Sequence, residues 1–151
     1  MCFVLIPAAL SDIILSMNTE SVAPTPPDVA TLHFFEAQPA ALPLYEAFEA
    51  RLCELFPESH KRVQKTQITF FNRHVFACVS FQKIKRKAEL PVPYLVITLG
   101  LPYPLGSDRA AVKCEPYPGR WTTHIVVGSV DELDDELFEW IGQSYTFAEI
   151  K

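Results

Sequence analysis

The chain has 151 residues, of which 49% are hydrophobic and 21% are charged, with a formal net charge of −5 at pH 7. This length favours one domain with a core of its own, and the ordinary composition is typical of a globular protein. The negative net charge argues against a general polyanion-binding protein.

The charge is unevenly spread along the chain. Residues 60–89 carry eight Lys or Arg against one Glu, a net +7, whereas residues 131–151 carry seven acids against Lys151, a net −6. Such asymmetry orients a partner or promotes head-to-tail contacts, although two solvated surfaces would give the same distribution.

The N-terminal stretch is apolar but does not have the pattern of a membrane segment. Residues 1–17 are interrupted by Pro7 and Asp12 and lack a basic start, so neither a membrane span nor a secretory signal is predicted, and Met17 is an alternative start. Residues 18–30 are Pro-rich and polar, which is typical of disorder. We therefore expect a tail over residues 1–31 and a single domain over residues 32–151.

Cysteine and histidine spacing argues against a metal site. The cysteines are Cys2, Cys53, Cys78 and Cys114, and no two form a CxxC pair. The histidines are His33, His60, His74 and His124, without metal-ligand spacing. We expect no metal and no cofactor. Scattered cysteines in apolar patterns favour buried, reduced thiols and a cytoplasmic protein.

Two amphipathic helices are predicted. The first runs over Pro43–Phe56, with Pro at its first position and apolar residues at helical spacing. The second runs from about Val130 to Tyr145, where Ser129 and Glu132 match a capping box. Its apolar stripe is Leu133, Leu137, Trp140 and Ile141.

Between the helices lie stretches rich in β-branched and aromatic residues. The five predicted strands are Lys65–Phe71, Val75–Phe81, Tyr94–Leu99, Ser107–Glu115 and Arg120–Val127. Short turns between successive strands favour antiparallel pairing. The sequence therefore predicts an α+β fold: a two-layer sandwich whose antiparallel sheet of about five strands has helices on one face and an open polar second face.

Alternation along the strands predicts which polar side chains share the open face. In the last strand Arg120, Thr122 and His124 alternate with the apolar set that begins at Trp121. The full predicted set is Lys65, Gln67, Thr69, Arg109, Lys113, Glu115, Arg120, Thr122 and His124. Because Arg and Lys donate to phosphate and carboxylate groups, we expect a binding module that recognises an anionic group. The alternative is an ordinary wet sheet face.

Two other functions are open. In the first, a small hydrolase or transferase uses His124 as general base and Glu115 to orient it, although the sequence contains no nucleophile or phosphate-loop motif. A structural, hydrogen-bonded His124 is the competing interpretation. In the second, the acidic C-terminal helix contacts a metal or a protein. Expected partners are an anionic small molecule or a protein; nucleic acid has little support, and no membrane contact is expected.

Four segments together resemble a known family. They are KTQITF at 65–70, GLPYPL at 100–105, EPYPGRWTTHIVV at 115–127 and the final DELFEWIGQSYTFAEIK. From about Leu32 to Lys151 the chain is similar to a bacterial family of domains of unknown function, found alone or at the C-terminal end of small predicted transport proteins. The layout also resembles YdhG-like and MmcQ/YjbR-like domains, whose fold is compared with frataxin. The resemblance implies a cytoplasmic α+β domain and supplies no activity.

Overall fold

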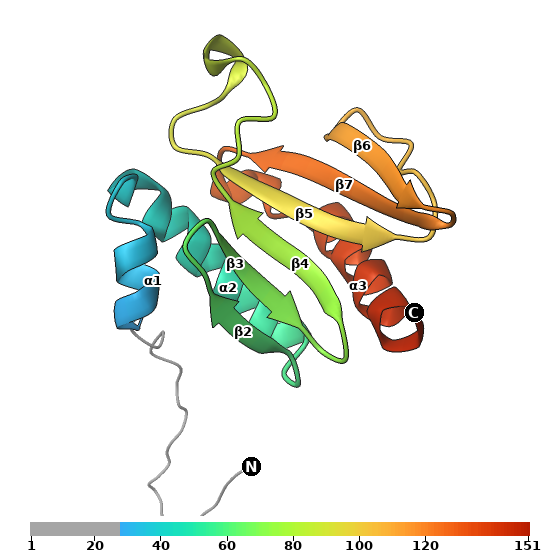
Figure 1. Ribbon diagram of the computed structural model, residues 1–151. Coiled ribbons are helices and arrows are strands. Elements are labelled where there is room, and N and C mark those ends of the chain that lie inside the picture. The colour runs from blue at the N-terminus through green and yellow to red at the C-terminus, as the bar shows by residue number, and fades with distance from the viewer. Residues whose placement is uncertain (1–27) are drawn as a thin grey trace, which may run out of the picture.

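Helices pack behind an antiparallel sheet in the computed structural model, which describes residues 28–151 (Figure 1). The helices are α1 (Val29–Phe34), α2 (Leu42–Leu55) and α3 (Asp135–Ile150), with single 3₁₀ turns at Pro39–Ala41, Lys87–Glu89 and Val130–Glu132. Residues 29–31, which we expected in the tail, begin α1 after Asp28, whose side chain accepts from the backbone N–H of Thr31. The rest of the predicted tail lies outside the described residues.

The sheet has six strands in the order β2-β3-β4-β5-β7-β6, and every neighbouring pair is antiparallel. The strands are β2 (His60–Val63), β3 (Gln67–Phe71), β4 (Val75–Ser80), β5 (Leu95–Leu101), β6 (Ala110–Tyr117) and β7 (Arg120–Val127). The α+β class and the antiparallel sheet are confirmed. The sequence predicts about five strands, one fewer than the six observed, because β2 is a short edge strand whose residues show no strand pattern.

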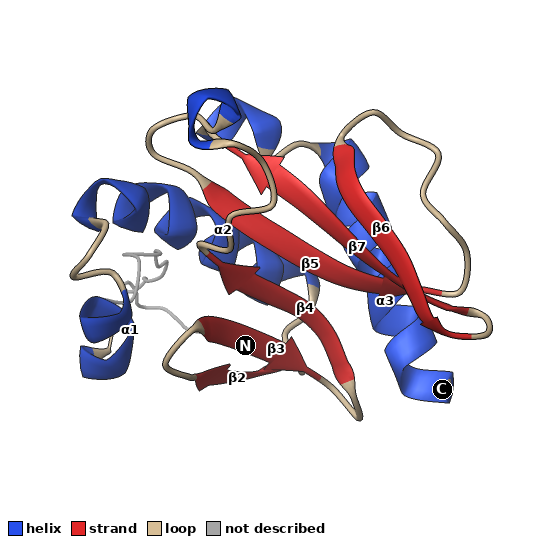
Figure 2. Ribbon diagram, turned by 45° about the horizontal axis from the view of Figure 1, so that its top comes forward, coloured by secondary structure: helices blue, strands red, loops and turns tan. Residues whose placement is uncertain are grey.

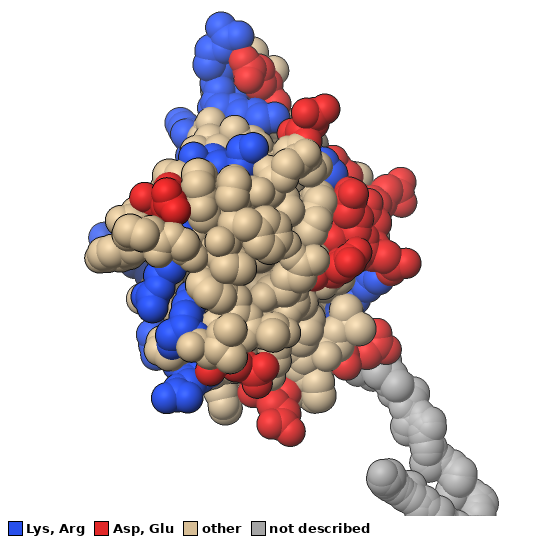
Figure 3. Space-filling view, turned by 90° about the vertical axis from the view of Figure 1, so that its right-hand side faces the viewer, with Lys and Arg blue, Asp and Glu red and all other residues tan. Residues whose placement is uncertain are grey.

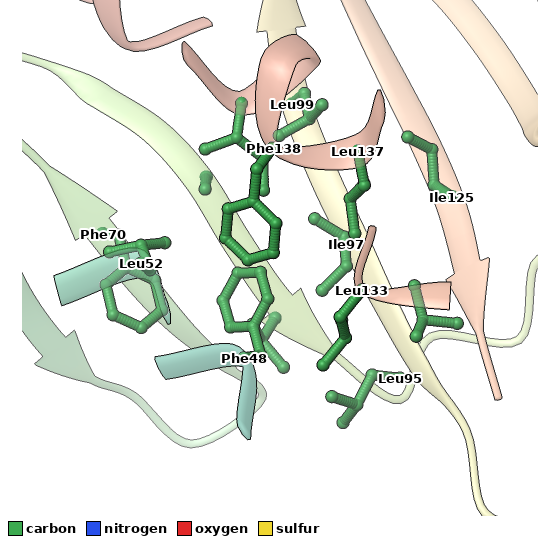
Figure 4. Close-up of a cluster of buried hydrophobic side chains, with 14 of the residues drawn as sticks. Phe48, Leu52, Phe70, Leu95, Ile97, Leu99, Ile125, Leu133, Leu137 and Phe138 are labelled. Atoms are coloured by element: carbon green, nitrogen blue, oxygen red, sulfur yellow. The ribbon is translucent and has the colours of Figure 1, made fainter. Parts of the chain in front are cut away.

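The core lies between one sheet face and the two longer helices. Cross-strand partners such as Ile97 and Ile125 point to the same face and are fully buried. In Figure 4 Phe48 of α2 lies between Phe70 and Phe138, with ring centroids 5.9 and 5.8 Å away. The predicted apolar stripe of the last helix, which begins at Leu133, is buried as expected. None of the helices described is both long and apolar enough to cross a membrane.

The last helix begins later than predicted. Asp134 is its N-cap, and its side chain accepts from the backbone N–H of Leu137 at 3.0 Å. The predicted capping box is wrong: Ser129 makes no side-chain cap, and the Glu132 carboxylate instead accepts from the N–H of Gly128 at 2.6 Å. The helix therefore begins after Asp134, because the carboxylate of Asp134, and not that of Glu132, accepts from a free N–H group in the first turn.

The C-terminal half of α3 is bonded into the sheet where β4 and β5 separate. Their pairing ends at Ala77–Leu99, and beyond it the buried Ser144 hydroxyl donates to the Phe76 carbonyl (2.6 Å) and accepts from the Gly100 N–H (3.1 Å). The turn between β3 and β4 holds the end of the helix. There Asn72 donates to the Tyr145 carbonyl, and a ring nitrogen of His74 lies 2.9 Å from the Ala148 carbonyl.

Candidate functional site

The sheet face opposite α2 and α3 carries a row of polar side chains that crosses four strands. Both helices lie behind the sheet in Figures 1 and 2, which leaves this face toward the reader. Strand pairing aligns Thr69, Cys78, Thr98 and His124 in one row, from β3 to β7. Cross-strand partners share a face, and the adjacent pair Leu99–Thr123 is buried on the helix side, so this row lies on the open side. Thr122, Gly100 and Cys114 form the next row.

His124 is hydrogen-bonded on this face, but not to the predicted partner. Its Nδ1 lies 2.8 Å from the Thr98 hydroxyl on the neighbouring strand. The ring is half-buried, and burial lowers the pKa of His124, which favours neutral imidazole at pH 7. Glu115 accepts from the N–H of Gly119 across its own turn, at 2.9 Å. The two predicted catalytic residues are therefore not brought together.

A cysteine in the same row does not supply a nucleophile for His124. Cys78 lies two strands from His124, with Thr98 between them. Neighbouring strands are about 4.8 Å apart, so the two side chains are roughly 10 Å apart, too far for a thiol–imidazole pair. Burial also raises the pKa of the Cys78 thiol, which favours the unreactive protonated form.

Two of the predicted binding residues lie on the helix side of the sheet. The Arg109 guanidinium pairs with Asp134 (2.9 Å) and Glu136 (3.1 Å), at the start of α3. Lys113 pairs across the sheet with the buried Thr123, and its amine donates to the Leu105 carbonyl at 2.9 Å. The predicted placement of both residues on the open face is wrong. For Lys113 the reason is an irregularity in the register of β6 between Ala110 and Val112, which shifts the alternation of its side chains. Arg109 lies before β6, and its side chain reaches the acids at the start of α3.

Three predicted residues on β3 and the turn before it lie apart from β7. Gln67 donates to the Thr69 hydroxyl (3.2 Å), and this hydroxyl donates to Gln64 (2.8 Å), so they form a local cluster. Gln67 is three strands from β7, roughly 14 Å. Lys65 is exposed in the turn between β2 and β3. Of the predicted set, Arg120, Thr122 and His124 are adjacent, along β7.

A second cation, Lys151, which strand alternation does not predict, lies near the N-terminal end of β7. The Lys151 amine donates to the Val75 carbonyl at 3.2 Å and lies 3.4 Å from where a Cβ on Gly100 would stand. Gly100 pairs with Thr122, so the amine reaches the open face. Burial, and then the positive charge of Arg120, lower the pKa of Lys151. Strand alternation cannot reveal a residue that arrives from a helix end.

The two cations lack acidic partners. Among residues 28–151, no carboxylate lies within ion-pair distance of Arg120 or Lys151. The acids at the start of α3 are differently placed, since Asp134 and Glu136 are held by Arg109, and Asp135 by Arg51. In the described part of the chain, no group of three or more His, Cys, Asp or Glu suits a metal ion.

The charges are separated across the molecule. In Figure 3 most Lys and Arg lie at the left and top of the view, most Asp and Glu lie at the right and bottom, and a broad uncharged surface lies between them. The charge asymmetry of the sequence is therefore also an asymmetry in space. An uneven charge distribution of this kind orients a charged partner.

Comparison with known proteins identifies a family. No curated protein and no solved structure matches the chain. A family model described as "Domain of unknown function (DUF5655)" matches residues 31–148. The expected membership in a family of domains of unknown function is confirmed, while the likeness to YdhG-like and MmcQ/YjbR-like domains stays a prediction. The chain belongs to the DUF5655 family.

Proposed function

We propose that this protein is a binding module that recognises an anionic group at the N-terminal end of β7, between Arg120, Thr122 and Lys151. In this proposal the sheet and its helices form two layers, and the uncovered layer face binds the ligand. The observation that supports it is the position of the Lys151 amine beside Gly100, the cross-strand partner of Thr122, two residues from Arg120, with no ion pair from either cation to a described carboxylate. Two like charges at close range destabilise each other, and a bound phosphate or carboxylate would relieve this repulsion.

The surrounding residues fit such a ligand. Thr122 and His124 follow Arg120 at alternate positions of β7, so hydroxyl, imidazole and guanidinium lie in line on one face. When Nδ1 of His124 accepts from Thr98, its Nε2 carries the proton and donates outward. A guanidinium fork with an ammonium beside it binds two oxygens of one anionic group. A small phosphorylated or carboxylated molecule matches this set best.

Nothing in the contacts of His124 favours the hydrolase or transferase alternative. Its hydrogen-bond partner is a threonine, and Glu115 is engaged elsewhere. A nucleic-acid backbone would need a longer cationic track than Arg120 and Lys151 provide. The cytoplasmic location expected from the sequence stays a prediction.

The experiment compares inorganic phosphate, pyrophosphate and citrate with chloride at equal ionic strength, by thermal unfolding and by amide chemical shifts. A ligand at ten times its Kd stabilises the fold by about 1.4 kcal/mol. We expect one or more of these anions to raise Tm and to shift the amides of residues 120–124. Arg120→Gln and Lys151→Gln should each abolish both effects. The matched control is Arg62→Gln, an exposed cation on β2.

Two results would overturn the proposal. One is the absence of stabilisation by every anion tested. The other is stabilisation of the same size in wild type, Arg120→Gln and Lys151→Gln, which would mean that the anion acts through ionic strength or binds elsewhere.

A further inference from the structure

A groove runs along the outer side of α3 and borders the β7 site at one point, because the Lys151 amine lies 5.5 Å from the centroid of the Phe147 ring that lines the groove. Its volume is about 570 Å³, and the segment Pro102–Tyr103, which follows β5, forms its second wall. Glu139, Gly142, Gln143, Thr146, Phe147 and Ile150 recur at helical spacing and form the first wall. The groove therefore follows about three turns of the helix, roughly 16 Å.

The groove exposes apolar side chains. Ile150 is 77% exposed and Tyr103 is 39% exposed, and Phe147 lies beside them. The same helix buries its opposite side in the core, whereas Ile150 on this second apolar side stays exposed in the described fold. Figure 3 views this side of the molecule, where the end of β5 and the end of α3 lie, and shows a broad uncharged surface. Contiguous apolar surface of this kind marks an interaction site.

Acidic side chains beside the groove favour a basic partner. Glu139 lines the groove, and Glu149 is exposed on the same helix. Neither has an ion pair with another described residue, unlike the acids at the start of the helix that Arg51 and Arg109 neutralise. A fitting partner therefore presents apolar side chains flanked by Lys or Arg.

The chain carries a segment with this chemistry. The loop between β4 and β5 contains Lys83-Ile84-Lys85, and both lysines are exposed without an ion pair to any described residue. Val92, in the same loop, is 92% exposed. Figure 1 shows this loop projecting away from the sheet beyond the start of β5. The far end of the groove, at Tyr103 and Ile150, lies at the opposite end of β5, roughly 20 Å from the loop, so the loop does not fill this end in its own copy.

We infer that the loop 83–92 of one copy docks into the α3 groove of a second copy. Ile84 and Val92 fill the space beside Phe147 and Ile150, and Lys83 and Lys85 pair with Glu139 and Glu149. Because the two surfaces differ, the contact is head-to-tail: each copy keeps a free loop and a free groove, and association continues to a ring or a filament. The charge asymmetry of the sequence then acts between copies.

The test is sedimentation velocity from micromolar to submillimolar protein, at low and high salt. Wild type should self-associate with rising concentration and dissociate with added salt. A groove variant, Ile150→Asp, and a loop variant, Val92→Asp with Lys85→Glu, should each be monomeric. Both change exposed side chains, and far-UV circular dichroism verifies that they fold. Leu55→Asp, an exposed apolar residue at the end of α2, is the matched control and should associate as wild type does.

Mixing the two variants separates this contact from any symmetric one. The loop variant keeps an intact groove and the groove variant keeps an intact loop, so an equimolar mixture should form heterodimers and nothing larger. Three results would overturn the inference: a wild type that is monomeric throughout, a groove or loop variant that still self-associates, or a mixture that stays monomeric while wild type associates. Salt-insensitive association would also contradict it. Arg120 and Lys151 are unchanged in all variants, but Ile150→Asp places a carboxylate beside Lys151, so anion binding is compared with self-association in the loop variant, whose substitutions lie beyond the other end of β5.

Discussion

The Thr98 hydroxyl lies 2.8 Å from Nδ1 of His124, across the pair β5–β7. In a histidine that works as a general base, this nitrogen is commonly held by a carboxylate that stabilises the protonated ring. A neutral hydroxyl gives no such charge stabilisation. Burial acts in the same direction, and so His124 holds its proton less readily in the folded protein than in the unfolded chain.

The first prediction concerns pH. The unfolded pKa of histidine is about 6.5, and that of His124 in the folded state is lower. As pH falls below about 6.5, the unfolded chain binds the proton first, so the free energy of unfolding decreases. Denaturant unfolding at pH 7.5 and 5.5 should show a larger loss for wild type than for His124→Gln. NMR titration of His124 should give a midpoint below 6.5; a midpoint above that value would contradict the prediction.

The second prediction concerns Ser144, which satisfies two backbone groups between β4 and β5. Ser144→Ala leaves the buried Phe76 carbonyl and the partly buried Gly100 N–H without their hydrogen-bond partner. Each unsatisfied group costs about 1–3 kcal/mol, so we expect a loss of about 2–4 kcal/mol in denaturant unfolding. Thr146→Ala, on the exposed side of the same helix, is the control and should change stability by less than about 0.5 kcal/mol. Equal losses in both variants would refute this role.

The third prediction concerns the buried Thr123, whose hydroxyl has no hydrogen-bond partner among the described residues. Thr123→Val replaces the hydroxyl with a methyl group of similar volume. Because the native hydroxyl is desolvated without compensation, the valine variant should be about 1 kcal/mol more stable. Thr122→Val, on the open face of the same strand, should bring no such gain. A destabilised Thr123→Val variant would show that the hydroxyl is satisfied after all.

The fourth prediction separates Arg109 from the binding site. Arg109→Gln removes ion pairs to Asp134 and Glu136, a donor to the Glu132 carbonyl and a guanidinium that lies 5.5 Å from the Trp140 ring centroid. Thermal unfolding should show a loss of about 1–2 kcal/mol, since the pairs are only partly buried. Anion binding should be unchanged. The control is Lys65→Gln, which changes an exposed cation on a turn and should affect stability little. Weaker anion binding in Arg109→Gln would contradict the prediction that Arg109 lies outside the binding site.

Sequence periodicity predicted the central elements well. The bounds of β7 were predicted as observed, those of β3 to β5 within two residues, and the buried stripe of α3 was correct. β3 to β5 are largely buried on both faces and read as continuous apolar runs, whereas alternation marks β7 and helical spacing marks α3. β2 is different: His60–Val63 is polar, and Lys61 is turned inward to pair with Glu49 of α2. A charged edge strand of this kind carries no apolar alternation to detect.

The candidate site could be predicted only in part. Arg120, Thr122 and His124 were placed correctly relative to one another, because one strand carries all three. Lys113 was misplaced because an irregularity in the register of β6 is invisible in a list of residues. Lys151 was missed because its position depends on how α3 packs against the gap between β4 and β5. Tertiary packing, which local patterns do not encode, decides both cases.

The attachment of Lys151 to the sheet has a dynamic consequence. His74 and Val75 hold the final turn of α3, and Asn72 holds the turn before it. The Lys151 amine reaches through to the face where Arg120 lies. Helix ends fray readily, and here fraying would withdraw one of the two charges from the opposite side of the sheet. An anion bound between Arg120 and Lys151 would hold the Lys151 side chain in place and so stabilise the final turn of α3. Amide hydrogen exchange in that turn would slow, although the anion does not contact the helix backbone. The last residues of the helix would thus report occupancy on the far side of the sheet.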